Sequence, residues 1–119
     1  MENKEFAKLL EARTKLFAIR IIRLSSSLPS TQEARVVKNQ ITKSGTSVGA
    51  NYREANRSRS KADFYHKIQI CESEASETTY WLEIVLELNW SDLTETKQIL
   101  AEANELLAIF ISISKNLKT

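Results

Sequence analysis

The sequence predicts an all-α protein that folds as one antiparallel up-down-up-down four-helix bundle. Only two glycines and one proline occur among the 119 residues, whereas turn-rich β architectures need many of both. Apolar residues recur at steps of three and four along four long segments, which is the period of an α-helix. Short connections join the segments, so neighbouring helices should run antiparallel. The length suits a single domain, which we expect to span residues 1–119.

The first helix is predicted from about Lys4 to about Ser27. Pro29 disfavours helix in the residue before it and so ends the segment. Arg13 interrupts an otherwise apolar series. The residues expected to face the core are Phe6, Leu10, Arg13, Phe17, Ile21, Leu24 and Leu28.

The second helix is predicted from near Ser30 to around Arg57, with Ser30 and Glu33 as a capping box. Gly45 and Gly49 lie one turn apart, and each costs about 1 kcal/mol relative to Ala inside a helix. We therefore expect another helix to approach closely at these two positions. The inward-facing residues are Ala34, Val37, Ile41, Ser44, Val48 and Tyr52.

The third helix is predicted to begin near Ser60 or Lys61, with Ser60 and Asp63 as a pair of capping residues. Its apolar series has the same helical period as the first two helices. The residues expected in the core are Phe64, Ile68, Cys71, Ala75, Thr78, Leu82 and Val85.

The fourth helix is predicted from Ser91 or Asp92 to about Asn116. Its acidic start and basic end suit the two poles of the helix dipole. The residues expected in the core are Leu93, Leu100, Ala103, Leu107, Phe110 and Leu117.

Two helices carry more apolar residues than one buried face requires, which favours a homo-oligomer. The alternative is a monomer whose wide helices are deeply buried. In the first helix the additional residues are Leu9, Leu16, Ile19 and Ile22, and in the fourth they are Leu106, Ile109, Ile111 and Ile113.

Charge is distributed unevenly along the chain, although the net charge is only +2. Residues 35–67 hold eight basic and two acidic side chains, a net of +6. Residues 72–105 hold one basic and nine acidic side chains, a net of −8. This polarity predicts electrostatic complementarity, either within an assembly or towards a partner.

No catalytic residue, cofactor site or metal site is expected, so the sequence predicts a protein that is not an enzyme. The segment 45–51 lacks the Lys-Ser/Thr ending of a phosphate loop and follows no strand. His66 and Cys71 are five residues apart and lie on different parts of a helix surface. Glu72, Glu74 and Glu77 lack the Glu-x-x-His motif of bundle di-metal sites and indicate a solvated acidic face.

A cytoplasmic location is expected, with no membrane partner and no small-molecule substrate. Cys71 is the only cysteine, so no disulfide can form within the chain, and the first residues are polar. The segment 17–24 could instead lie on a membrane surface, but its apolar residues fit a core or an interface better.

The basic segment 51–61 is the strongest candidate for a binding site. Arg53, Arg57 and Lys61 are spaced by four and would align if the helix continued, while Arg59 lies in the predicted turn. Arg and Lys supply contacts to phosphates, so this segment predicts nucleic-acid binding. Alternatively, the bases pair with acids of the third helix or of a neighbouring subunit. The nucleic-acid-binding candidates are Arg53, Arg57, Arg59 and Lys61, with Lys43 and Lys38 as weaker ones.

The chain resembles the four-helix-bundle family known as the 23S rRNA intervening-sequence proteins. The resemblance lies in residues 43–56 (KSGTSVGANYREAN), 59–64 (RSKADF) and 72–77 (ESEASE). The chain departs from the family pattern at Ala55, where the family usually has glycine, and at Tyr52, where isoleucine is usual. The resemblance implies a homopentamer without enzymatic activity. Some members are encoded inside insertions in large-subunit ribosomal RNA genes.

The chain is also similar to the accessory variability determinant protein of diversity-generating retroelements, which implies basic surfaces that bind nucleic acid and a reverse transcriptase. We therefore expect a non-enzymatic oligomer that binds RNA or DNA backbone where the second helix meets the third. The alternative is an interaction scaffold that docks a partner such as a reverse transcriptase without touching nucleic acid. Within the family pattern, Asn51 and Glu54 are expected to be structural, binding Arg59 or capping the next helix.

Overall fold

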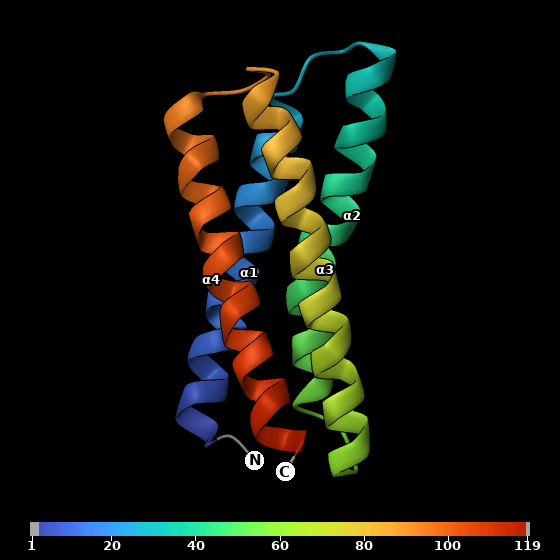
Figure 1. Ribbon diagram of the computed structural model, residues 1–119, viewed down its shortest axis with the longest axis vertical. Helices are drawn as coiled ribbons and strands as arrows, with labels where there is room; N and C mark the ends of the chain where they lie inside the picture. Colours follow the sequence, from blue (N-terminus) through green and yellow to red (C-terminus); the bar gives the residue numbers. More distant parts are fainter. Residues whose placement is uncertain (1–2, 119) are drawn as a thin grey trace.

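The computed structural model describes residues 3–118, and within this range the chain forms four α-helices and no strand. The all-α prediction is confirmed. Figure 1 shows successive helices running in opposite directions along the long axis, which is compatible with the up-down-up-down order. The bundle measures 45 × 23 × 20 Å. Its helices are α1 (Lys4–Ser26), α2 (Gln32–Ala55), α3 (Lys61–Glu87) and α4 (Leu93–Lys118).

Of the two predicted N-caps, the one of α3 is confirmed and the one of α2 is wrong. The side chain of Ser60 accepts a hydrogen bond from the Asp63 backbone N–H at 3.1 Å, as predicted for α3. In α2 the capping residue is Thr31, whose hydroxyl accepts from the Ala34 N–H at 3.1 Å. The predicted capping box at Ser30 is therefore wrong by one residue. Both hydroxyl residues are good caps, so local sequence does not choose between them.

The core confirms the predicted inward faces of α2 and α3. Every residue predicted to line the core from these two helices is buried. In α1, the core residue is Thr14 rather than Arg13, and its hydroxyl donates to the Leu10 carbonyl at 2.9 Å. Phe6 is 40% exposed and does not belong to the core. Thr14 satisfies its polar group within its own helix, so a small hydroxyl fits where a guanidinium would not.

The predicted inward face of α4 is partly wrong. Ala103 and Phe110 are buried as expected, but Ile99 and Leu106 fill the positions assigned to other residues. Leu93 is 49% exposed, while Leu100, Leu107 and Leu117 pack at the margin of the core. The apolar residues of α4 cover more than one face, so their spacing leaves the rotation of the helix open.

The two glycines of α2 let α1 approach closely, as predicted. A Cβ atom at Gly45 would lie 2.8 Å from both Cγ atoms of Ile21. A Cβ at Gly49 would lie 3.2 Å from the backbone carbonyl carbon of Thr14. The seam between α1 and α2 therefore has no room for side chains at these positions.

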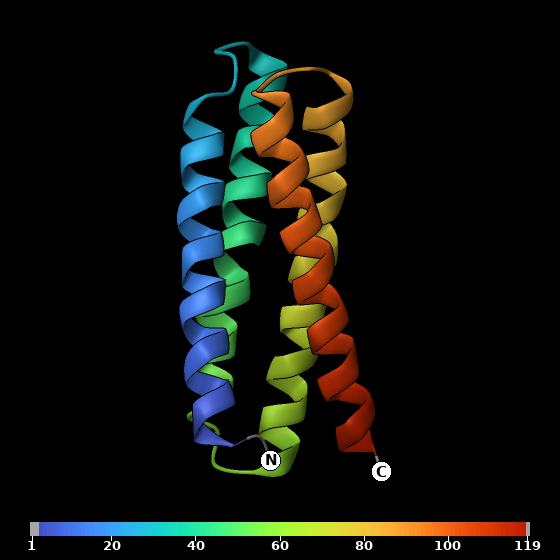
Figure 2. The same ribbon diagram turned by 90° about the vertical axis from the view of Figure 1, so that its left-hand side faces the viewer.

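The seam between α1 and α4 is shorter and is held by ion pairs. Arg13 binds Glu102 at 2.7 Å and Glu105 at 2.8 Å, and Arg20 lies 3.5 Å from Glu95. Hydrogen bonds to Glu102 and then Glu105 raise the pKa of Arg13 above its ordinary value. In Figure 2 the ribbons of α1 and α4 diverge toward the end where the chain begins. The ion pairs therefore join α1 and α4 along the part of their length where the ribbons lie closer together.

None of the helices in the described range combines the length and the apolar character needed to cross a membrane.

Candidate nucleic-acid interface

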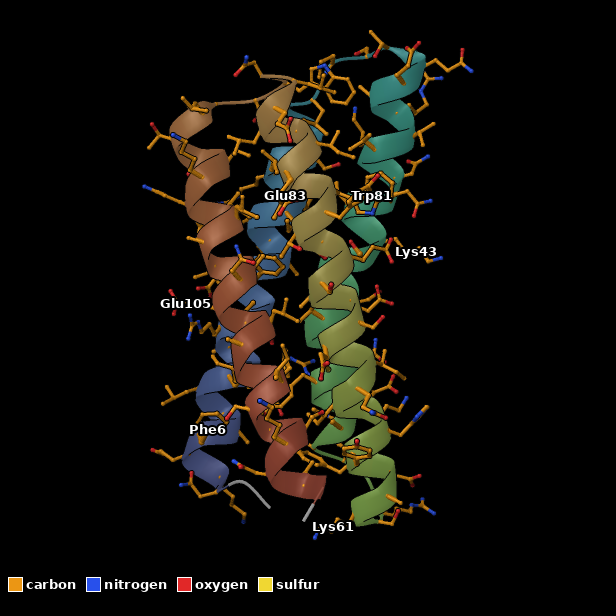
Figure 3. All side chains as sticks on the ribbon, viewed as in Figure 1. Phe6, Lys43, Lys61, Trp81, Glu83 and Glu105 are labelled. Carbon is orange, nitrogen blue, oxygen red and sulfur yellow. The ribbon has the colours of Figure 1, made fainter. Side chains whose placement is uncertain are left out.

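One end of the bundle is built from residues 3–11, 53–67 and 110–117, and we call it the basic end. It contains four of the six predicted binding residues, Arg53, Arg57, Arg59 and Lys61. Lys43 and Lys38 lie ten and fifteen residues before Arg53 along α2, or about 15 and 22 Å at 1.5 Å per residue. Figure 3 shows the separation of Lys43 from Lys61. The six residues therefore form one group of four and two separate lysines.

The four cations come from two helices and the turn between them. Since α2 ends at Ala55, Arg57 and Arg59 lie in the turn and Lys61 is the first residue of α3. The alignment of Arg57 and Lys61 on a continuing helix is therefore not realised. The turn instead brings the cations together at the tip of the bundle.

Backbone hydrogen bonds fix this turn, and a side chain anchors it to α1. The N–H of Arg57 donates to the Glu54 carbonyl and the N–H of Ser58 donates to the Ala55 carbonyl, both at 3.0 Å. Asn56 caps α2, and its side-chain amide donates to a carboxylate oxygen of Glu11 at 2.8 Å. The backbone that carries the cations is therefore tied to two helices.

Three of the cations have no ion-pair partner within the part of the chain that the structure describes. Arg57, Arg59 and Lys61 are exposed and form no ion pair there. The fourth, Arg53, is half exposed, and its Nε lies 3.8 Å from Glu11 Oε1. Such side chains can contact an anion without first breaking a strong ion pair.

Glu54 pairs with α3 rather than with Arg59, contrary to the expectation from the sequence. Its carboxylate accepts from Lys67 Nζ at 2.9 Å. This hydrogen bond, together with the lysine charge, lowers the pKa of Glu54 below its ordinary value. Asn51 donates to the Ser47 carbonyl of its own helix at 2.8 Å. Arg59 thus remains available at the surface.

Lys4 and Lys8 also lie at the basic end, although sequence reasoning did not include them. They line a surface hollow together with Asn56, Ser58 and Ser60. In an up-down bundle the start of the first helix lies beside the end of the second. The up-down topology therefore indicates that Lys4 and Lys8 lie near the basic turn, whereas the basic motif alone does not identify them.

Charge distinguishes the two ends of the bundle. The basic end has eight basic and four acidic side chains, a net of +4. The opposite end, residues 20–38 and 81–97, has five of each sign and a net of zero. Two helix starts and two helix ends lie at each pole, so the helix dipoles largely cancel. The positive character of the basic end therefore comes from its side chains.

The acidic side chains of residues 72–77 in α3 lie more than ten residues along the helix from Lys61. Trp81 Nε1 donates to Glu77 at 3.0 Å. Burial raises the pKa of Glu74, the Glu77 charge raises it further, and Lys43 opposes both. The acids at 72–77 thus interact with neighbours in the middle of the bundle.

Chemistry based on a metal or a nucleophile has no visible centre in the described residues. No group of three or more His, Cys, Asp or Glu side chains there is placed to hold a metal ion. The Cys71 thiol is buried and donates to the Val48 carbonyl at 3.5 Å, while His66 is exposed. The five-residue spacing therefore keeps His66 and Cys71 in different environments.

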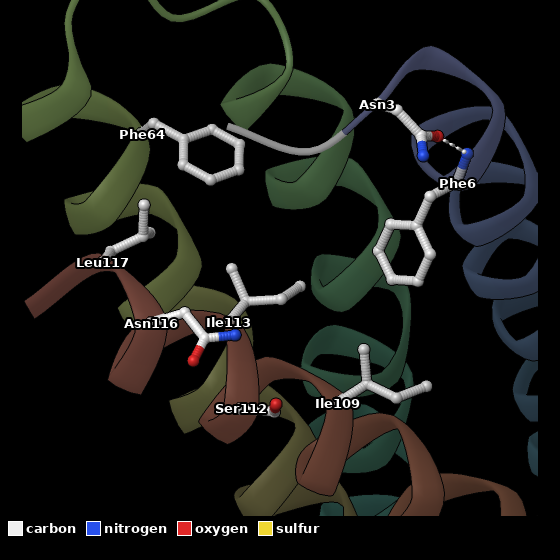
Figure 4. A pocket seen from close by; sticks show the side chains of 8 residues that line it. All are labelled: Asn3, Phe6, Phe64, Ile109, Ser112, Ile113, Asn116 and Leu117. Carbon is white, nitrogen blue, oxygen red and sulfur yellow. Dashed lines mark hydrogen bonds between the residues drawn. The ribbon is translucent and has the colours of Figure 1, made fainter.

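An apolar groove opens between α1 and α4 at the basic end. Figure 4 shows Phe6 of α1 across the groove from Ile109 and Ile113 of α4. Phe64 closes the groove from α3, and its side chain is buried. The groove presents apolar side chains at the surface and is a second candidate interaction site.

The chain matches the model of one protein family and is similar to solved structures. The model of the 23S rRNA-intervening sequence protein family matches residues 10–112. One of these solved structures is that of a protein with unknown function from the S23 ribosomal protein family of Bacteroides thetaiotaomicron. It is 38% identical, covers 88% of this chain and 97% of its own, and superposes with a TM-score of 0.81. No curated protein matches. The chain therefore belongs to the 23S rRNA-intervening sequence protein family.

Proposed function

We propose that this protein is a non-enzymatic, homo-oligomeric helical bundle that binds the backbone of RNA or DNA through its basic end. One observation carries the proposal. Arg57, Arg59 and Lys61, none of them ion-paired within the described range, alternate in sequence with Asn56, Ser58 and Ser60, which share a surface hollow with Lys4 and Lys8. Phosphates are the anions that such clusters of flexible cations contact in nucleic acids. Binding should depend little on sequence and should weaken steeply with salt, because each phosphate contact releases counterions.

The oligomeric part of the proposal rests on α1. Leu9 and Leu16 lie seven residues apart, on one side of the helix, and are 68% and 56% exposed. Ala12 and Ile19 continue this side at steps of three and four, the spacing of a helix-packing seam. A second copy would bury these apolar groups, and the family resemblance implies five copies.

The binding proposal is tested by fluorescence anisotropy with labelled RNA and DNA at two salt concentrations. The variant Arg57→Glu/Arg59→Glu reverses two exposed turn charges, and Arg23→Glu/Arg35→Glu makes the same charge change at the opposite end. We expect the first variant to lose about tenfold or more in affinity and the second to retain most of it. Equal loss in both variants would show that only overall charge matters.

The oligomer is tested by measuring molar mass with light scattering during gel filtration. We expect Leu9→Glu/Leu16→Glu to dissociate the assembly, since the introduced charges would be desolvated in the interface. Val36→Glu is a matched control, because Val36 is 57% exposed on α2. Unchanged mass in the Leu9/Leu16 variant would place the interface elsewhere.

A protein-interaction scaffold is the second candidate, and the apolar groove of Figure 4 favours it. On this proposal the groove docks a partner protein, such as a reverse transcriptase, without direct nucleic-acid contact. An Ile109→Glu/Ile113→Glu variant should then lose the partner in a nuclease-treated pull-down. If it still bound nucleic acid normally, the groove and the basic end would be separate sites.

A further inference from the structure

A second hollow continues from the basic end along the α1–α2 seam. It is lined by three cations, Lys15 of α1 with Arg53 and Arg57, and by two acids, Glu11 and Glu54. It is also lined by Ala18, Gly49 and Ala50, which are too small to fill the hollow. A ligand backbone can approach closely over such residues.

The two hollows meet at Glu11, which lines both. Lys4 and Lys8 line the first hollow together with Glu5, and Lys15 lines the second, so α1 carries cations on both sides of Glu11. From Lys4 to Lys15 the path is eleven residues, or about 16 Å of helix. That is long enough to follow several consecutive phosphates of a strand.

This path lacks exposed aromatic side chains within the described residues. The one aromatic residue that lines it, Phe64, is only 5% exposed. Tyr52 is buried in the core, and Phe6 points into the groove of Figure 4. Proteins that hold single strands combine a positive groove with aromatic side chains on which the bases stack. Cations without such a platform suit a backbone whose bases remain paired.

We propose, as an extension of the proposed function, that the ligand is double-stranded nucleic acid and that one of its strands follows this path. Lys4, Lys8 and Lys15 of α1 contact phosphates from one side, and Arg53 of α2 and Arg57 of the following turn contact them from the other. The bases stay stacked within the duplex and are not read. RNA and DNA duplexes share this chemistry.

Glu11 provides a test in which binding should improve. Its carboxylate lies at the junction of the two hollows, accepts from Asn56 at 2.8 Å and lies 3.8 Å from Arg53. Glutamine keeps an oxygen that can accept from Asn56 but removes a negative charge from the path. We therefore expect Glu11→Gln to bind duplex several-fold more tightly at low salt.

The experiment measures anisotropy of a labelled duplex RNA, a duplex DNA and their separated strands over a salt series. We expect both duplexes to bind at least about tenfold more tightly than the single strands, because stacking contributes nothing here. In Lys8→Ala/Lys15→Ala the slope of log affinity against log salt should shrink by about two. Lys43→Ala/Lys97→Ala, which removes two exposed lysines away from the path, should leave the slope unchanged.

The outcomes separate this inference from the proposed function. If single strands bind as tightly as duplexes, the ligand class is wrong. If Arg57→Glu/Arg59→Glu abolishes binding while Lys8→Ala/Lys15→Ala and Glu11→Gln change nothing, the path is wrong and the proposed function stands. If neither duplexes nor single strands bind at low salt, the proposed function itself fails. Matching thermal unfolding curves for all variants exclude misfolding as the cause of a loss.

Discussion

Helix α1 makes two very different seams with its neighbours. Toward α2 it packs against glycines, so that the Ile21 side chain lies directly on Gly45. Toward α4 it relies on Arg13 and its two glutamates, beside an open apolar groove. The α1–α2 contact is therefore stabilised by close packing, and the α1–α4 contact is stabilised by ion pairs.

This difference shows how one helix can serve two purposes. The close α1–α2 seam fixes the relative positions of the cations that flank it, Lys15 and Arg53 among them. The α1–α4 seam leaves Phe6 and Ile109 accessible to a partner. Changes in one seam should therefore affect stability and binding differently from changes in the other.

The largest effect is expected from closing the space in the α1–α2 seam. Gly45→Ala places a methyl group 2.8 Å from atoms at the branch of Ile21, which is buried and cannot swing away. Despite better helix propensity, the free energy of unfolding should fall by about 1–3 kcal/mol. Gly49→Ala, with contacts of 3.1–3.2 Å to Thr14, should cost less. Urea unfolding measures both, and stabilisation by Gly45→Ala would show that the seam is loosely packed.

A smaller effect is expected from the ion pairs of the α1–α4 seam. Arg13→Ala removes two charge-assisted contacts, one of them to Glu102, whose side chain is only 18% exposed in the intact protein. The loss should be about 1–2 kcal/mol and should shrink in high salt, which screens the charges. Arg20→Ala is the control, since Arg20 contacts Glu95 only at 3.5 Å. An equal loss of unfolding free energy in Arg13→Ala and Arg20→Ala would contradict the stronger role assigned to Arg13.

The smallest effect is expected from the exposed pair between α2 and α3. Lys67 lowers the pKa of Glu54, so their interaction stabilises the fold above the ordinary carboxyl pKa of 4.5 and is lost as pH falls through the lowered value. Glu54→Gln should therefore reduce Tm slightly at neutral pH and leave it unchanged in strong acid. If the Tm difference between Glu54→Gln and the unmodified protein grew as pH fell, the direction assigned to the Glu54 pKa shift would be wrong.

Most of the fold could be predicted because core residues recur at the helical period in α2 and α3. This spacing identified residues such as Ile41 and Ile68, even though α3 also carries Trp81 and Ile84 outside its buried face. In α4 apolar residues occupy several sides, and Leu93 was assigned to the core where Ile99 is found. Only packing against the other helices fixes that rotation.

The site could be predicted only where its residues are close in sequence. The turn residues Arg57 and Arg59 follow directly from the basic motif. Lys8 and Lys15 are separated from it by more than thirty-five residues and join it only through the fold. Lys43 belongs to the basic stretch in sequence, yet helix geometry carries it away from the end.

The most direct test of the central claim is to locate the ligand on the unmodified protein. Lysine acetylation can be followed by mass spectrometry with and without duplex RNA. Binding at the basic end should slow the reaction of Lys4, Lys8 and Lys61 while Lys43 and Lys97 react at their free rates. Protection of Lys43 and Lys97 with no change at Lys8 and Lys61 would contradict the account.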